Sequence, residues 1–490
     1  MVASGARVEI TTGPGRLRGV RADGVSRFLG IPYGAPTSGA RRFRLPDPVD
    51  AWDGVRDAST FGPTCPQTDM SGGPRRNRHL DPNPEREDCL VLNVWTPGPD
   101  DRRRPVMVWL HGGGLHAGSA SDPLTDGAAL ARHGDVVVVG VNHRLGVLGF
   151  LHLGPGMGPE LASAGMVGMA DVVAALRWVR DEIAGFGGDP DDVTVFGQSG
   201  GGQKTGMLLA MPAADGLFHR AVCQSGFALT VGNRLDPTEL ADFVLGEVGV
   251  AAGDLEHLQS LPVTEIVRAA EVATQRFGSM VFSGVVDGVV LPAQPADRIA
   301  HGASAHVPLL LGTTAHEFRG VGQAPGLDAM GDEGLRAMLG GVIGRADTGA
   351  GTDGPIAAYR RAFPDAGPGF LFGEIFTDYL TIGVERTADA RAAAGGAPVY
   401  RYVFAPPPAF HSGELAPLFR ARGDGPIADL MGDTWTAFAR TGSPCHDGLP
   451  DWPAHDLDTR ATMYLDRPAR VATDPFHEVR DRWAPIASTI

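Results

Sequence analysis

A serine between glycines is the most chemically specific feature of the sequence. Residues 197–201 follow the pattern G-x-S-x-G around Ser199, directly after a strand-like run at 193–196 and before a helix-compatible segment at 205–211. This pattern is typical of a tight turn from strand to helix, because flanking glycines let backbone segments approach that a Cβ would hold apart. We therefore expect the Ser199 hydroxyl to be exposed at the carboxyl edge of a sheet, where it can act as a nucleophile.

A second glycine turn can stabilise the charge that such a nucleophile creates. The sequence H-G-G-G at 111–114 directly follows the apolar run 106–110. A turn of this kind aims successive N–H groups at one position, and the oxyanion of a tetrahedral intermediate needs such donors. We expect an oxyanion hole formed by the backbone amides of Gly113 and Gly114, together with that of Gly200 directly after the serine.

Serine is a weak nucleophile, so it needs a base and an acid that orients the base. In a parallel sheet of this plan, the acid follows the second strand after the nucleophile's strand, and the histidine follows the last strand. Glu317 follows the run 307–311, and His411 follows the run 399–404. The resulting chain order of serine, glutamate and histidine differs from the orders of the two well-known serine protease classes.

Five other residues compete for these roles: His316, His446, His455, Asp287 and Asp378. His316 adjoins the candidate acid, but neighbouring side chains in a sequence point apart. The other two histidines lie in a tail rich in glycine and proline. Each aspartate is more typical of a turn or a helix cap, and both remain alternatives for the acid.

The elements that must position these residues are visible as alternating patterns. Short β-branched runs alternate with helical stretches, which is typical of parallel βαβ units. The seven runs are 91–95, 106–110, 136–141, 193–196, 221–223, 307–311 and 399–404. Between the third and the fourth run, apolar residues recur at helical spacing over 171–184. The sequence therefore predicts an α/β fold with a large, mostly parallel sheet flanked by helices.

Two long segments interrupt this alternation. Residues 227–305 and 320–398 are longer than a crossover requires, and we expect them to be largely helical insertions that cover the active-site edge of the sheet. The runs 8–11 and 27–31 predict a small N-terminal sheet. No linker and no internal repeat is visible, so we expect a single catalytic domain over residues 1–490.

Composition narrows the choice of partners. The 490 residues carry a net charge of −15, which disfavours nucleic acid and anionic membrane surfaces. No apolar run approaches the length of a membrane span, and the first thirty residues contain no secretory signal. We therefore expect a cytoplasmic protein, with secretion as the alternative, and the oligomeric state is left open.

Cofactor motifs are also missing from the sequence. Residues 197–205 nearly form a P-loop, but Gln203 stands where glycine must precede the lysine. The metal-site spacings C-x-x-C and H-E-x-x-H do not occur. We expect a reaction that needs no cofactor and no metal.

Over nearly its whole length the sequence resembles the type-B carboxylesterases, the cholinesterase-like branch of the α/β-hydrolase superfamily. The shared motifs lie in order at 28–33, 87–94, 111–114, 142–146, 186–190, 197–201, 224–226, 287–288, 317, 411 and 414–415. The resemblance implies an α/β-hydrolase fold and a cofactor-free serine ester hydrolase. The nucleophile, base and acid that it implies are Ser199, His411 and Glu317. The oxyanion donors that it implies are Gly113, Gly114 and Gly200.

Four positions depart from the usual pattern of this family. Gln198 replaces a glutamate before the serine, Gly200 replaces an alanine after it, Leu115 replaces a phenylalanine and His143 replaces a tyrosine. Gln198 removes a carboxylate beside the nucleophile, and no aromatic residue lies between the first two cysteines to hold a quaternary ammonium group. We therefore expect neutral small-molecule esters as substrates, and not choline esters.

The resemblance also implies a disulfide between Cys65 and Cys89. A disulfide conflicts with a cytoplasmic location, where thiols are kept reduced, so we expect reduced or mixed thiols. The residues alone leave other activities open: an amide or carbamate hydrolase or an acyl transferase with the same triad, and a non-catalytic binding protein on the same fold.

Overall fold

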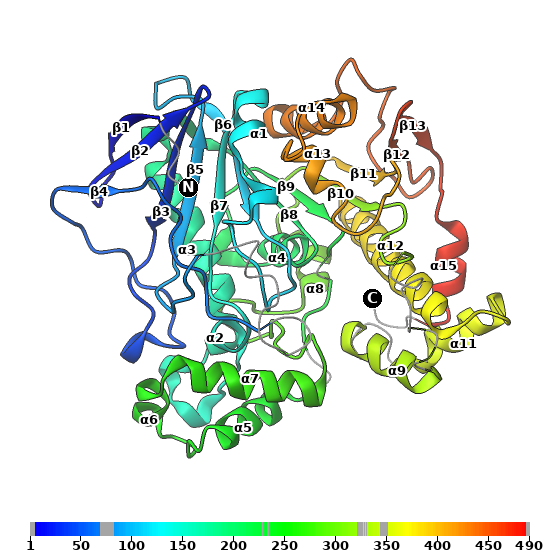
Figure 1. The fold of residues 1–490 in the computed structure, drawn as a ribbon. Helices are drawn as coiled ribbons and strands as arrows, with labels where there is room; N and C mark the ends of the chain where they lie inside the picture. Colours follow the sequence, from blue (N-terminus) through cyan, green and yellow to red (C-terminus); the bar gives the residue numbers. More distant parts are fainter. Residues whose placement is uncertain are drawn as a thin grey trace.

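One large sheet organises the fold. The computed structural model describes residues 5–486 except 69–82, 228, 233–234, 321–326, 328, 330 and 344–350. The strands are β1 (Ala6–Thr11), β2 (Arg16–Ala22), β3 (Val25–Pro32), β4 (Val55–Asp57), β5 (Val91–Thr96), β6 (Arg104–Leu110), β7 (Val137–Val141), β8 (Gly188–Gln198), β9 (Arg220–Gln224), β10 (Leu309–Thr314), β11 (Val399–Phe404), β12 (Thr462–Leu465) and β13 (Arg470–Ala472). Within the described residues, these thirteen strands lie in the order β1-β2-β3-β5-β7-β6-β8-β9-β10-β11-β12-β13, with β4 beside β2 (Figure 1).

The strand directions confirm a mostly parallel sheet. In the sheet order, every pair from β7 to β12 is parallel, and the pairs at both ends are antiparallel. All seven predicted strands are present, and the first of them, β5, is antiparallel to β7. The predicted small N-terminal sheet is formed by β1 to β4 and is continuous with the large sheet, because β3 pairs with β5.

Two strands beyond β11 correct the expectation that it is the last. β12 pairs with β11 in parallel, and β13 pairs with β12 in the antiparallel direction. β12 has four residues and β13 has three, and both lie in the tail that is rich in glycine and proline. Runs this short give no detectable alternation of apolar and polar residues.

The helices cover both faces of the sheet. They are α1 (Ala128–Gly134), α2 (Gly146–Phe150), α3 (Val167–Glu182), α4 (Gly200–Leu208), α5 (Pro237–Glu247), α6 (Leu255–Ser260), α7 (Val263–Phe277), α8 (Pro295–Ala300), α9 (Gly331–Val342), α11 (Asp353–Ala362), α12 (Pro368–Ala394), α13 (Leu415–Leu418), α14 (Pro426–Thr441) and α15 (His477–Trp483). Along β6, Val106 and Val108 point into one core cluster, and Met107 and Trp109 point into the other, because successive side chains of a strand alternate. The first cluster is completed by α3, α5 and α7, and the second by α1 and α14.

The predicted crossover helix is α3. The helical stretch Pro159–Phe186, which contains α3, is long and apolar enough to cross a membrane by length and composition. Of its most apolar window, 78% is buried inside the protein. Val172, Leu176 and Val179 of α3 belong to the core cluster on one face of the sheet, so this stretch is a core helix.

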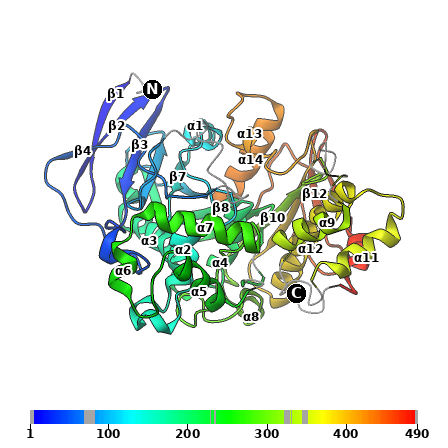
Figure 2. The same ribbon diagram turned by 60° about the horizontal axis from the view of Figure 1, so that its bottom comes forward.

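The two segments predicted as insertions hold two groups of helices. Residues 227–305 contain α5 to α8, and residues 320–398 contain α9, α11 and α12. Figure 1 shows the first group, in green, below the sheet and the second group, in yellow, to its right. In Figure 2, α4, which begins directly after Ser199, is seen between the two groups.

Candidate active site

Ser199 lies on the turn between β8 and α4. Its backbone has φ 57° and ψ −121°, a conformation that residues other than glycine rarely adopt. The Ser199 amide donates to the carbonyl oxygen of Gln224 at 2.7 Å, which ties the turn to β9. A Cβ on Gly201 would stand 1.9 Å from the carbonyl oxygen of Leu110. Glycine is therefore required where α4 begins against the end of β6.

Glu317 and His411 come together from the loops after β10 and β11. Nδ1 of His411 lies 2.5 Å from Oε2 of Glu317. The backbone amide of His411 donates to the Glu317 carbonyl oxygen at 2.9 Å. The Glu317 side chain is fully buried, whereas that of His411 is 18% exposed. The pair thus consists of a buried acid and a partly accessible imidazole.

The second carboxylate oxygen of Glu317 has donors of its own. Oε1 accepts from the Ser225 hydroxyl at 2.6 Å and from the Thr314 amide at 2.7 Å. Burial on its own would raise the pKa of the Glu317 carboxyl, but the facing His411 and the hydrogen bonds from His411, Ser225 and Thr314 outweigh burial and lower this pKa. Glu317 is therefore ionised at neutral pH and fixes the proton of His411 on Nδ1.

The other ring nitrogen of His411 faces Gln198. Nε2 of His411 lies 3.2 Å from Nε2 of Gln198. Because Nδ1 carries the ring proton, His411 Nε2 is the acceptor and the Gln198 amide donates. The ring of Phe318 stacks on the imidazole, with centroids 4.5 Å apart and an interplanar angle of 29°. The imidazole is thus held at both nitrogens and on one face.

A cavity of about 340 Å³ opens over Ser199 and His411. The three glycines predicted for the oxyanion hole line it as well: Gly113, Gly114 and Gly200. Four aromatic rings and two aliphatic side chains make its wall largely apolar: Phe227, Phe318, Phe376, Tyr379, Met280 and Leu380. Met280 comes from the first predicted insertion and Phe376 from the second, so both segments contribute to the wall.

The glycine turn packs directly on the residue that follows the serine. Gly113 has φ 89° and Gly114 has φ 64°, a left-handed backbone that favours glycine. A Cβ on Gly200 would stand 2.1 Å from the carbonyl oxygen of Gly114. An alanine at position 200 would therefore push the turn away from α4, which gives this departure from the family pattern a structural reason.

The competing residues lie in other contacts. Oδ1 of Asp378 accepts from Arg319 at 3.1 Å, and Asp287 closes a turn by accepting from the Leu291 amide at 3.0 Å. None of the competing residues is among the described residues that line the cavity: His316, His446, His455, Asp287 and Asp378. Ser199 and His411 thus line one cavity, and Glu317 bonds His411, whereas none of the alternatives lines that cavity.

Cys65 and Cys89 are buried free thiols. A hydrogen bond with Cys65, together with burial, raises the pKa of the Cys89 thiol. Among the residues that the structure describes, no group of three or more His, Cys, Asp or Glu side chains is arranged to hold a metal ion.

Two features of the site carry no role that a sequence motif assigns. Ser225 bonds the candidate acid, and its only sequence signal is its place in the motif at 224–226 that resembles the family pattern. The aromatic residues of the cavity wall, such as Phe376 and Tyr379, lie at helical spacing on α12. Such spacing is equally typical of a buried helix face, so it carries no functional signal.

Comparison with known proteins identifies the family. The model of the carboxylesterase family matches residues 5–327. The chain belongs to the carboxylesterase family. The para-nitrobenzyl esterase of Bacillus subtilis is 35% identical, over 97% of this chain and 98% of that protein. Human carboxylesterase 3 is also 35% identical, over 96% of this chain and 89% of that protein.

Solved structures of carboxylesterases have the same fold. A carboxylesterase of Geobacillus stearothermophilus, Est55, matches with a TM-score of 0.83 and 38% identity, over 97% of this chain and 100% of that one. A thermophilic p-nitrobenzyl esterase matches with a TM-score of 0.84 and 33% identity, over the same shares of the two chains. The protein is therefore a carboxylesterase, an enzyme that hydrolyses carboxylic esters, and the family resemblance is confirmed.

Proposed function

We propose that this carboxylesterase hydrolyses neutral small-molecule esters with Ser199 as nucleophile, His411 as base and Glu317 as acid. The amides of the oxyanion hole are those of Gly113, Gly114 and Gly200. The observation that carries the proposal is the 2.5 Å bond between Glu317 and His411 beside a cavity that Ser199 and His411 both line. A nucleophile, a base and an orienting acid at one cavity are the parts that acyl transfer requires.

The reaction has two halves in this mechanism. For attack, the Ser199 hydroxyl replaces the Gln198 amide as the partner of His411 Nε2. His411 takes the hydroxyl proton as Ser199 Oγ bonds to the ester carbonyl carbon, and the turn amides stabilise the oxyanion. The alcohol leaves with the proton from His411, and an acyl-enzyme remains. Water, deprotonated by His411, then releases the acid and restores Ser199.

The cavity wall supports neutral, apolar substrates. None of the described residues that line the cavity is an aspartate, a glutamate, a lysine or an arginine. Aromatic rings make up much of the remaining wall, and a volume of about 340 Å³ suits a small ester. The related protein named para-nitrobenzyl esterase is consistent with an ester of an aromatic alcohol, and we take 4-nitrobenzyl and 4-nitrophenyl esters as the first substrates to measure.

Labelling with a fluorophosphonate tests the nucleophile. We expect one covalent adduct per chain, on the peptide that contains Ser199, and loss of esterase activity in step with labelling. Prior incubation with a neutral ester that occupies the cavity should slow both. An adduct on another residue contradicts the assignment, and a protein that is not labelled contradicts a serine mechanism.

A matched pair of substrates tests the bond that is cleaved. 4-Nitrophenyl butyrate and 4′-nitrobutyranilide share the acyl group and the nitroaromatic ring, and they differ in the ester or amide bond. We expect cleavage of the ester and none of the anilide. Release of butyrate as the main product in the presence of added alcohol supports hydrolysis, whereas a new butyrate ester indicates acyl transfer.

We also infer that the chain works as one catalytic domain in the cytoplasm. Both helical segments, 227–305 and 320–398, supply cavity residues, which supports a single body. The free thiols of Cys65 and Cys89 are consistent with a reducing compartment. We expect both thiols of the freshly purified protein to be alkylated when the protein is unfolded in the alkylating reagent. Mass spectrometry measures this alkylation. A bonded pair contradicts the cytoplasmic location.

A further inference from the structure

The amine of Lys204 is buried behind the site and has no part in the mechanism above. Lys204 is the only lysine in the sequence, and it lies on α4, the helix that begins directly after Ser199. Its side chain is fully buried. Among the described residues no carboxylate forms an ion pair with it, and its Nζ lies 2.9 Å from Nε2 of His143. Burial lowers the pKa of the Lys204 amine to about 7.

The groups around the amine set the direction of this hydrogen bond. Nδ1 of His143 lies 2.8 Å from the Arg144 carbonyl oxygen, so Nδ1 carries the proton and Nε2 accepts from Lys204. Burial, assisted by nearby positive groups, lowers the pKa of His143 and keeps its ring neutral. The charge of Arg144 is matched by Asp171, with N–O distances of 2.7 and 2.8 Å. Lys204 is therefore a donor both as amine and as ammonium.

His143 connects this amine to the glycine turn. The rings of His143 and His111 are stacked, with centroids 5.0 Å apart and an interplanar angle of 8°. His111 is the first residue of the turn, and its Nδ1 lies 2.9 Å from the Gly112 carbonyl oxygen. A Cβ on Gly118 would stand 2.4 Å from the same nitrogen, so the loop closes tightly on the ring. Two rings thus join the nucleophile's helix to the turn that lines the cavity.

Burying an amine with one neutral acceptor opposes folding, and a methionine would fill the same space without that cost. A local cost of this kind is most often retained at a functional site. We propose that Lys204 is a positioning residue, which holds the His111 ring in place by donating to His143. It thereby sets where the turn amides lie relative to the serine. This inference rests on the oxyanion hole of the proposed function.

Two substitutions of Lys204 separate positioning from packing. Lys204→Met removes the donor but keeps a similar shape, and Lys204→Gln keeps an N–H donor. For Lys204→Met we expect kcat for 4-nitrophenyl butyrate to fall about tenfold with an unchanged KM, because the turn amides act on the transition state. Lys204→Gln should stay within about threefold of the parent enzyme. Met207→Leu, another buried position of α4, controls for repacking and should leave kcat unchanged.

The affinity for a transition-state analogue is a measurement that a change in packing alone does not alter. An aryl trifluoromethyl ketone forms a tetrahedral adduct with Ser199 whose oxyanion occupies the proposed hole. We expect its affinity for Lys204→Met to fall by the same factor as kcat/KM. Three results would each overturn the inference. They are an unchanged kcat in Lys204→Met, an equal loss of kcat in Lys204→Gln, and a change in Lys204→Met that affects KM alone.

A paired variant keeps the test decisive if Lys204→Met does not fold. Lys204→Met combined with His143→Phe replaces both partners by apolar groups, which avoids an unpaired buried acceptor. We expect kcat of this double variant to fall about tenfold, as in Lys204→Met, because it also lacks the donor. A double variant with the full kcat of the parent enzyme overturns the inference. Ser199→Ala separates the two proposals, because activity that survives it contradicts the proposed function itself.

Discussion

Ser199, Ser225 and Glu317 have a left-handed backbone although none of them is a glycine. The φ angles are 57° for Ser199, 48° for Ser225 and 32° for Glu317. Such conformations persist only where surrounding contacts impose them, and they cluster at functional sites. Here the Ser199 amide bonds the residue before Ser225, and the Ser225 hydroxyl bonds Glu317. The strained residues are therefore linked to one another at the carboxyl ends of β8, β9 and β10.

Gly200→Ala tests the close approach of the glycine turn. The new Cβ would meet the Gly114 carbonyl oxygen at 2.1 Å, so the turn must move by about 1 Å to restore contact distance. We expect kcat for 4-nitrophenyl butyrate to fall about 10- to 100-fold with little change in KM. Gly246→Ala, a helical glycine with open space around its Cβ position, should keep full activity. Full kcat in Gly200→Ala contradicts this account of the turn.

Gln198→Glu tests the missing carboxylate beside the nucleophile. Gln198 lines the cavity and lies 3.2 Å from His411 Nε2. A carboxylate there stabilises the imidazolium and attracts cations. We expect the acid limb of the kcat/KM profile to move to higher pH, because the base must be neutral to act. Selectivity for a choline ester over its neutral 3,3-dimethylbutyl isostere should also rise, and unchanged selectivity refutes the role given to Gln198.

Local motifs predicted Ser199, His411 and the glycines that line the cavity with them, but neither their contacts nor the aromatic wall. The glycine patterns around Ser199 and Gly113 depend on backbone geometry, which neighbouring residues determine. The contact of Gln198 with His411 and that of Lys204 with His143 join segments far apart in the sequence. They depend on how helices and loops pack, which a single sequence does not specify.

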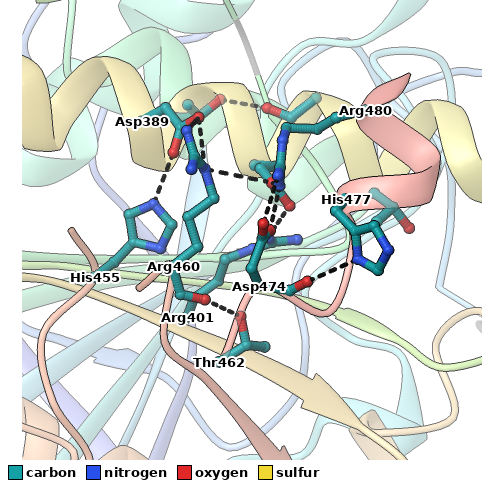
Figure 3. A network of polar contacts seen from close by, with 12 residues as sticks. Asp389, Arg401, His455, Arg460, Thr462, Asp474, His477 and Arg480 are labelled. Atoms are coloured by element: carbon teal, nitrogen blue, oxygen red, sulfur yellow. Dashed lines mark hydrogen bonds and ion pairs between the residues drawn. The ribbon is translucent and has the colours of Figure 1, made fainter. Parts of the chain in front are cut away.

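At the scale of elements, α12 joins the cavity to the C-terminal segment. Phe376 and Tyr379 of α12 line the cavity, and Glu385 and Asp389 lie further along the same helix. Figure 3 shows the polar network around this end of α12, in which Asp389 faces His455 and Arg460, and Arg480 of α15 reaches Asp474. The C-terminal segment therefore holds the helix that forms one wall of the cavity.

Arg401→Met tests the buried centre of this network. The side chains of Arg401 and its partner Glu385 are 0% and 1% exposed, and removing one member of such a pair leaves an uncompensated buried charge. Because Arg480 also bonds Glu385, we expect the lower end of the usual range, a loss of about 3 kcal/mol in the free energy of unfolding measured with urea.

A surface pair provides the matched control for that measurement. Arg180 and Asp181 form an ion pair with side chains 52% and 53% exposed. Arg180→Met should cost less than about 1 kcal/mol. Equal losses in the two variants would contradict a structural role for the Arg401 pair.

The central elements were predictable because burial shaped their sequences. Strands covered on both faces, such as β6 and β7, are apolar runs between turn signals. The antiparallel direction of β5 was not visible, since an apolar run looks the same in either direction. Four strands toward the two ends of the sheet were missed, β2, β4, β12 and β13, because they are short or carry mixed polar residues.

At the scale of the whole molecule, the buried amine makes stability depend on pH. The folded-state pKa of Lys204 is lowered from 10.5 to about 7. Below pH 7 the Lys204 side chain is protonated in both the folded and the unfolded state, so the full cost of burying its charge is present. Between pH 7 and 10.5 the unfolded state binds more protons, so the free energy of unfolding rises with pH, by up to about 1.4 kcal/mol per pH unit.

Urea unfolding of the parent enzyme and of Lys204→Met across this range isolates that contribution. The free energy of unfolding of the parent enzyme minus that of Lys204→Met should increase as pH rises from 7 to 9. Lys204→Gln should give the same trend, since it also removes the titrating group. A difference that does not change with pH, or that decreases as pH rises, contradicts the assignment of a buried amine to Lys204.

Replacement of Ser199 tests most directly whether this site carries out the ester hydrolysis. Purified Ser199→Ala, with its unfolding midpoint and circular dichroism matched to those of the parent, should be assayed with 4-nitrophenyl butyrate. The mechanism predicts that kcat/KM falls by more than about 10³-fold, because loss of a nucleophile exceeds loss of one oxyanion donor. Substantial hydrolysis by the folded Ser199→Ala protein would contradict it.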